Sequence, residues 1–105
     1  MKRGEVWLCT LDPTVGAEIR KTRPCLIVSP DDLNQRLQTL LVAPMTSAGR
    51  PSRFRVQVTF QRTSGLILTD QVRALARERL VRRLGWVDDA ALAQTLAILQ
   101  QMFAA

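Results

Sequence analysis

Residues 24–29, Pro-Cys-Leu-Ile-Val-Ser, are the stretch of sequence from which the fold is most directly worked out. The run is nearly all apolar, with Arg23 before it and Pro30-Asp31-Asp32 after it. A short apolar run bounded by turn-forming residues is typical of a strand buried on both faces. We therefore predict a buried strand over 24–29, followed by a turn and a helical turn over 33–37.

Further segments have the length and composition of short strands. They are residues 6–11, 39–45, 55–60, 66–69 and 80–87, with loops at 12–22 and 48–53 and a turn at 63–65. In the third of these strands polar and apolar residues alternate, so Val56, Val58 and Phe60 fall on one face. The pattern predicts a mainly β fold, a small curled sheet or partly open barrel in one domain over 1–105.

A C-terminal helix is expected over residues 90–103, capped by Asp88 or Asp89. The segment contains no Gly, Pro or charged residue, and its apolar side chains form two adjacent stripes: Leu92, Leu96, Leu99 and Phe103 in one, Ile98 and Met102 in the other. A helix this apolar is buried more widely than one sheet would bury it. Two interpretations are open: the helix packs deep in its own core, or part of it lies in a homodimer interface.

The charge of the chain indicates an anionic partner. The sequence holds 15 Lys and Arg against nine Asp and Glu, a formal net charge of +6, and most of the basic residues are Arg. Arginine grips a phosphate through two parallel hydrogen bonds, which lysine cannot do. The composition therefore favours a nucleic acid or an acidic protein as partner, the alternative being a basic surface that serves solubility.

Several classes of chemistry are excluded by composition. The chain has no His, so no His-based acid–base pair, triad or metal site can form. Its two cysteines, Cys9 and Cys25, are too few for a zinc tetrad, and we expect them reduced and buried as small apolar residues, or facing each other across a strand pair. There is no Gly-rich phosphate loop or nucleophile elbow. We expect no metal and no cofactor.

Features of a secreted or membrane-bound chain are not found. The N-terminal residues lead directly into a strand pattern, and no stretch approaches 18 consecutive apolar residues. We therefore expect a cytoplasmic protein without a membrane partner.

Polar residues at the ends of the predicted strands are the candidates for a site. Arg23 precedes one strand, Thr46 and Ser47 follow another, and Asp70 and Gln71 follow a third. Side chains at strand ends are held firmly and still face solvent. Each also has a structural alternative: an ion-pair partner, a turn former or a strand-end cap. From the residues alone, the prediction is a basic nucleic-acid-binding β domain.

Several short motifs occur in the order found in one known family. They are Arg-Gly-Glu-Val-Trp at 3–7, Leu-Asp-Pro at 11–13, Gly-Ala-Glu at 16–18, Arg-Pro at 23–24, Ser-Pro-Asp at 29–31 with Asn34, Ala-Pro-Met-Thr-Ser at 43–47 and Asp-Gln-Val-Arg at 70–73. Together they resemble the MazF/PemK family of toxin endoribonucleases of type II toxin–antitoxin systems, over nearly the whole chain.

The resemblance implies a small SH3-like curled barrel of the CcdB/PemK type, with a C-terminal helix, acting as a homodimer. It implies sequence-specific, metal-independent cleavage of single-stranded RNA to 2′,3′-cyclic phosphate and 5′-OH ends, which inhibits translation and growth. It also implies a cognate antitoxin whose acidic C-terminal segment lies along the RNA groove.

The resemblance also implies roles for individual residues. Arg23 and Thr46 match the family's catalytic pair, Glu18 matches a loop residue near the cut, and Asp70 matches a residue proposed as general base in one branch. That branch carries an Arg two positions before this Asp, where the present chain has Leu68. We expect Glu18, and after it Asp70, to act as acid or base.

The assigned chemistry suits these side chains. Arg23 would stabilise charge on the phosphoryl oxygens, and Thr46 would donate a hydrogen bond to one of them. The residues expected to bind RNA are Arg20, Lys21, Ser47, Arg50, Arg53, Arg55 and Gln71.

Two other functions are compatible with such a fold. One is a non-catalytic SH3-like nucleic-acid-binding module. The other is a gyrase poison like CcdB, but that branch relies on a Trp-Gly-Ile ending, and this chain ends Met102-Phe103-Ala104-Ala105.

Overall fold

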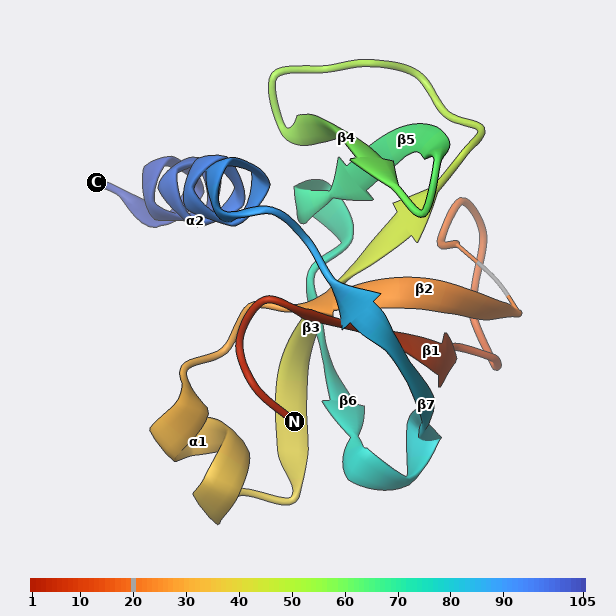
Figure 1. Ribbon diagram of the computed structural model, residues 1–105, viewed down its shortest axis with the longest axis vertical. Coiled ribbons are helices and arrows are strands. Elements are labelled where there is room, and N and C mark those ends of the chain that lie inside the picture. The colour runs from red at the N-terminus through yellow and green to blue at the C-terminus, as the bar shows by residue number, and fades with distance from the viewer. Residues whose placement is uncertain (20) are drawn as a thin grey trace.

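The apolar run that predicts a buried strand belongs to β2 (Thr22–Ile27), in the middle of a curled antiparallel sheet (Figure 1). The computed structural model describes residues 1–19 and 21–105. On either side of β2 lie β1 (Glu5–Thr10) and β3 (Thr39–Thr46). Cys25, Leu26 and Ile27 are fully buried. The predicted burial of this strand is confirmed, although the strand begins two residues earlier and ends two residues earlier than expected.

Strand β3 pairs with β2 on one side and with two different strands on the other. The strand order is β4 (Arg55–Phe60), β5 (Thr63–Leu68), β3, β2, β1 and β7 (Leu80–Trp86). The short β6 (Arg73–Ala76) pairs with the first half of β3, and β5 pairs with its end. Between β5 and β6 the chain forms a single 3-10 turn, η1 (Thr69–Gln71). This break lets one side of β3 pair with two successive strands, both antiparallel to it.

The β4–β5 hairpin differs from the prediction. The strand expected at 66–69 starts at Thr63, and the turn lies at Gln61-Arg62, because Phe60 pairs with Thr63. Both turn residues have positive φ, 49° and 66°. A two-residue hairpin turn of this kind is usually marked by Asn-Gly or Asp-Gly, and nothing of that sort stands here, so the pattern pointed to the Gly65 region instead.

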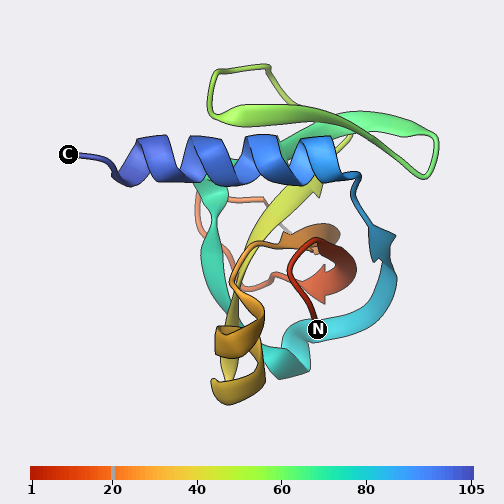
Figure 2. The ribbon, with the colours of Figure 1, turned by 60° about the vertical axis from the view of Figure 1, so that its left-hand side comes forward.

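The helices cover one side of the sheet. The first, α1 (Asp31–Arg36), replaces the helical turn expected at 33–37, and a second 3-10 turn, η2 (Arg77–Arg79), leads into β7. The long α2 (Asp89–Phe103) crosses the molecule beneath the β4–β5 hairpin in the view of Figure 2. Its N-cap is Asp88, whose carboxylate accepts a hydrogen bond from the Ala91 amide at 2.8 Å. This confirms one of the two expected caps.

The C-terminal helix is not packed deep in its own core. Within α2 only Ala91 and Thr95 are buried, and Leu92, Leu96 and Leu99 are half-buried. Phe103 is 77% exposed. The helix therefore closes one end of the core and leaves part of its apolar stripe on the surface.

The two cysteines lie in the smaller of two apolar cores, on neighbouring strands. Cys9 and Cys25 are both fully buried and both are free thiols. A hydrogen bond with Cys9, together with burial, raises the pKa of the Cys25 thiol. The expectation that they serve as small apolar residues is confirmed.

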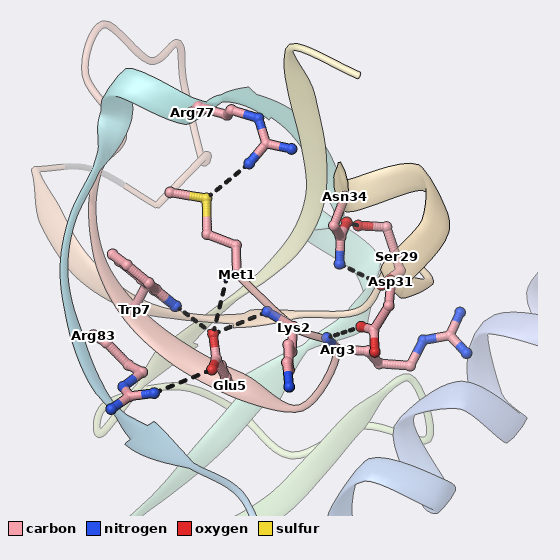
Figure 3. A network of polar contacts seen from close by, with 10 residues as sticks. All are labelled: Met1, Lys2, Arg3, Glu5, Trp7, Ser29, Asp31, Asn34, Arg77 and Arg83. Carbon is pink, nitrogen blue, oxygen red and sulfur yellow. Dashed lines mark hydrogen bonds and ion pairs between the residues drawn. The ribbon is translucent and has the colours of Figure 1, made fainter. Parts of the chain in front are cut away.

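Several residues of the family-like motifs have structural roles near the N-terminus (Figure 3). The Arg3 amide donates to Asp31 at 2.8 Å, and the Arg3 guanidinium donates to the Val28 carbonyl at 2.9 Å. The buried Asn34 side chain donates to the Ser29 carbonyl at 3.0 Å. The two bonds of Arg3 tie the N-terminal segment to the β2–α1 connection, and the Asn34 bond fixes that connection internally.

Glu5 collects several donors at the start of β1 (Figure 3). One carboxylate oxygen accepts from the Lys2 amide at 2.9 Å and the Trp7 indole at 3.0 Å, and lies 3.7 Å from the N-terminal ammonium. The other lies 3.4 Å from the Arg83 guanidinium of β7. Burial works against ionisation, but these donors outweigh it, and the pKa of Glu5 is lowered.

We predict that Glu5→Gln destabilises the protein by about 1–2 kcal/mol at neutral pH, since it removes charge-assisted hydrogen bonds. A carboxylate whose pKa is lowered by folding contributes stability above its unfolded pKa of about 4.3, and loses it as the pH falls through the folded value. Urea unfolding should show the difference from wild type shrinking as the pH approaches about 3. Glu78→Gln, at an exposed glutamate of η2, is the control; an undiminished difference at low pH would contradict the assignment.

Candidate functional site

Arg23 and Thr46 come from neighbouring strands that meet at one end of the sheet. The register pairs Cys25 with Pro44, so continuing it by two residues brings Arg23 opposite Thr46. Both residues are half-buried and both line the same cavity, of about 230 Å³. Ser47 lines it too. Three residues predicted from strand ends are thus gathered around one hollow.

Thr46 is held in place by its own turn and by the strand beside it. Its hydroxyl donates to the Ala48 carbonyl at 2.8 Å and accepts from the Ala48 amide at 3.1 Å. On the other side β5 approaches so closely that a Cβ on Gly65 would lie 2.5 Å from the Thr46 carbonyl oxygen. Only glycine fits at that position without moving the backbone, so the position of Thr46 depends on Gly65.

Arg55 and Asp70 form a bidentate ion pair next to Thr46. The Arg55 Nε and Nη2 atoms donate to the two Asp70 oxygens, each at 3.1 Å, and Nη1 donates to the Arg50 carbonyl at 3.2 Å. Hydrogen bonding to Asp70 raises the pKa of Arg55. A Cβ on Gly49 would lie 3.2 Å from Thr46 Cγ2 and 3.7 Å from Arg55 Nη1, which places the pair close to Thr46.

This ion pair explains the departure at Leu68. In the hairpin register Arg55 is the partner of Leu68. The guanidinium beside Asp70 therefore comes from β4 instead of from the position two residues before the Asp. The sequence alone does not predict the Arg55–Asp70 contact, because it places the hairpin turn at 63–65 instead of at 61–62. With the correct turn, the alternation along 55–60 would bring Arg55 opposite Leu68 and so close to Asp70.

The β1–β2 loop is fastened to η1 by Gln71. The Gln71 side-chain oxygen accepts from the Ile19 amide at 2.8 Å. Within the loop the Glu18 carboxylate accepts from the Val15 amide at 2.6 Å, and the Lys21 amide donates to Asp12 at 3.0 Å. Glu18 is exposed and lies outside the lining of the Arg23–Thr46 cavity.

The remaining described residues that are expected to bind RNA lie on the surface. Lys21, Arg50 and Arg53 are exposed, and the Arg53 guanidinium stacks 4.5 Å from the centre of the Phe54 ring. Arg20 lies outside the described residues. The described basic side chains flank the cavity and do not line it, apart from Arg23.

Among residues 1–19 and 21–105, no three His, Cys, Asp or Glu side chains gather as metal ligands do. In the same part of the chain, no helix is long and apolar enough to cross a membrane.

Comparison with known proteins identifies the family. The profile described as "PemK-like, MazF-like toxin of type II toxin-antitoxin system" matches residues 2–103. This chain belongs to that family, which confirms the resemblance seen in its motifs.

Two curated relatives are named endoribonucleases. Endoribonuclease PemK of Escherichia coli is 42% identical over 80 residues, which cover 71% of this chain and 60% of PemK, less than two thirds of its length. Endoribonuclease MazF9 of Mycobacterium tuberculosis is 37% identical, with 90% of this chain and 88% of the relative covered.

A solved structure confirms the fold. MazF of Deinococcus radiodurans superposes with a TM-score of 0.86 at 26% identity, covering 97% of this chain and 94% of that chain. The expected curled β architecture with a C-terminal helix is therefore correct.

We predict that Gly65→Ala displaces Thr46 and destabilises the fold by about 1–3 kcal/mol, because the added methyl group overlaps a backbone carbonyl. Urea unfolding measures the loss, and the amide resonance of Thr46 reports the displacement. Ser64→Ala, at the exposed neighbouring position, should change neither. A Gly65→Ala protein with the stability and the Thr46 resonance of wild type would show that the close approach is not rigid.

Proposed function

We propose that the protein is the toxin of a type II toxin–antitoxin system and a sequence-specific endoribonuclease. It cleaves single-stranded RNA without a metal ion, leaves 2′,3′-cyclic phosphate and 5′-OH ends, and so inhibits translation and growth in the cytoplasm. One observation carries the proposal: Arg23 and Thr46 line one cavity in a chain whose curated relatives are named endoribonucleases.

The chemistry needs three kinds of help. The 2′-oxygen of the RNA forms a bond to phosphorus, and the bond from phosphorus to the 5′-oxygen breaks. A proton must leave the 2′-OH, negative charge must be stabilised on the phosphoryl oxygens, and the departing 5′-oxygen must gain a proton. Because Arg23 is half-buried between strands, its guanidinium can be aimed in advance at the developing charge, which is often the largest catalytic contribution.

Thr46 supplies a second donor. Its hydroxyl now donates to Ala48, and rotation of the O–H would redirect that bond to a phosphoryl oxygen while the Ala48 amide continues to hold the hydroxyl oxygen. The turn thus fixes the oxygen and leaves the proton adjustable. This division suits a group that must meet the phosphate only when RNA is bound.

Of the two candidate acid–base groups, Glu18 is the proposed proton acceptor, and Asp70 has a different role. Asp70 is held by both nitrogens of the Arg55 fork, so its carboxylate is better suited to fixing Arg55 beside Thr46 than to accepting a proton. Glu18 lies in the loop that Gln71 ties to η1, and this loop leads into β2, the strand that contains Arg23. We therefore assign the proton acceptor to Glu18 and a positioning role to the Arg55–Asp70 pair.

The basic residues around the cavity would follow the RNA backbone. We propose this role for Lys21, Arg50 and Arg53, with Ser47 at the cavity itself; for Arg20, which lies outside the described residues, contact with RNA is proposed from the sequence alone. Contacts of this kind are independent of sequence and weaken as salt is added. The same surface would attract the acidic C-terminal segment of a cognate antitoxin, so that substrate and inhibitor compete; solved structures of the Deinococcus radiodurans relative include a MazE-MazF complex.

We predict that Arg23→Ala and Thr46→Ala each reduce RNA cleavage about 100-fold or more, because each removes a donor to the developing charge. Purified protein is incubated with single-stranded RNA in EDTA, and the fragments are analysed for cyclic phosphate ends. Arg36→Ala, in α1 away from the cavity, is the control. Full cleavage by either variant would show that the site is misplaced, and RNA that is retarded in a gel but never cut would favour a non-catalytic binding module.

We further propose that the protein acts as a homodimer through the apolar face beside α2. A groove there is lined by Val28, Leu41, Val72, Leu96, Leu99 and Phe103 among others. Leu41 is 39% and Phe103 77% exposed. A second copy of the chain would remove this apolar surface from water.

Phe103→Glu should therefore convert a dimer to a monomer, since it places a charge in the interface without disturbing the monomer, where the side chain is already exposed. Sedimentation at micromolar concentration measures the mass. Gln101→Glu, exposed on the same helix, should leave the dimer intact. A monomeric wild-type protein under these conditions would rule out the proposed interface.

A further inference from the structure

An open seam separates β4 and β7, the strands at the two ends of the main pairing order. Within the part of the chain that the structure describes, the Gln61 side-chain nitrogen Nε2 donates across this seam to the Leu84 carbonyl at 2.9 Å. Beside this bond the Phe60 ring lies 3.6 Å from the position of a Cβ on Gly85. The described residues show no ladder of backbone hydrogen bonds between these two strands. In Figure 2 the tip of the β4–β5 hairpin and the end of β7 lie on the same side of the molecule.

The cavity that contains Arg23 and Thr46 extends into this seam. Its apolar walls come from Met45, Val58, Phe60, Leu66 and Leu84, and its polar rim from Ser47, Gln61, Thr63 and Ser64. The volume of about 230 Å³ is below the range of about 300–1,000 Å³ typical of pockets for drug-sized ligands. Apolar walls and a polar rim of this size suit one planar heterocycle, whose faces are apolar and whose edge carries hydrogen-bonding groups.

Among the polar residues of the rim, Gln61 has a side chain whose orientation suits it to recognise the hydrogen-bonding edge of a heterocycle. Its bond to Leu84 fixes the amide and uses one donor. A side-chain amide offers two donors and one carbonyl acceptor, so a donor and an acceptor remain on a group of known orientation. Glutamine amides recognise base edges by such donor–acceptor pairs.

We propose that this seam pocket, walled by Phe60 and Leu84, receives one unstacked RNA base adjacent to the scissile phosphate, and that Gln61 determines which base is accepted. The inference rests on the proposed endoribonuclease function and adds a specificity site to it. Proximity requires the base to be a neighbour of the cut, because Arg23 and Thr46 line the same cavity.

The test compares cleavage preferences. A pool of randomised single-stranded RNA is digested in EDTA by wild type, Gln61→Ala and Gln61→Met, and the cut ends are sequenced. Both Gln61 variants should lose about tenfold in base discrimination at one position next to the cut, the size expected for one or two hydrogen bonds. The control is Gln57→Ala, at an exposed glutamine of β4 that is not part of the pocket lining, and it should keep the wild-type profile.

Unchanged preference in active Gln61 variants would overturn the proposal and leave the proposed function standing, whereas a wild type that cuts no RNA in EDTA would overturn both. A second measurement covers the case in which the variants fail to fold. Wild-type protein is crosslinked to an RNA that carries a 2′-deoxy nucleotide at the cut and 4-thiouridine beside it. Crosslinks should map to residues 60–64, and crosslinks confined to other segments would contradict the pocket assignment.

Discussion

The pairing of β2 with β3 is the constraint on which the rest of the molecule depends. It joins two strands with buried apolar centres, and its register, continued by two residues, brings Arg23 opposite Thr46. The remaining strands add to this pair: β1 and β7 on one side, and β5 and β6 in succession on the other. Because the site lies where the central pair ends, the apolar side chains that stabilise the fold also fix the spacing of the polar ones.

Around the β2–β3 pair, several segments are held by one side-chain contact each, where neighbouring strands of a regular sheet would be joined by a series of backbone hydrogen bonds. Gln71 holds the β1–β2 loop, the Arg55–Asp70 ion pair joins β4 to η1, and Gln61 spans the seam. Isolated contacts of this kind stabilise a fold modestly, but each determines where one segment lies. The surroundings of the site are thus arranged by side chains, and substitutions there can alter recognition while the apolar core stays unchanged.

Much of the fold follows from the sequence, since alternation identifies β4 at its observed bounds, the apolar run identifies β2, and Asp88 caps α2 as expected. The position of the hairpin turn does not follow from the sequence, because Gln61 and Arg62 adopt positive φ although neither is the Asn or Gly that usually marks such a turn. The wrong turn also hides the ion pair. If the turn were centred on Ser64, Arg55 would not be the partner of Leu68, and its contact with Asp70 could not be predicted. Short β6 cannot be predicted from the pattern, because Leu75 is its one buried side chain.

For the site, strand ends and family resemblance together selected Arg23 and Thr46. The contacts of Gln61 and Gln71 could not be predicted in this way, because their partners are distant in sequence.

The burial of both thiols has a practical consequence. Cys9 and Cys25 are fully covered, and thiolate, the reactive form, is disfavoured where the pKa of a cysteine is raised. A cysteine introduced on the surface would therefore be the preferred target of a maleimide dye, with both native residues left in place. Donor and acceptor fluorophores attached in this way, on the hairpin tip and on the loop that Gln71 holds, would let the approach of these two segments be followed in solution.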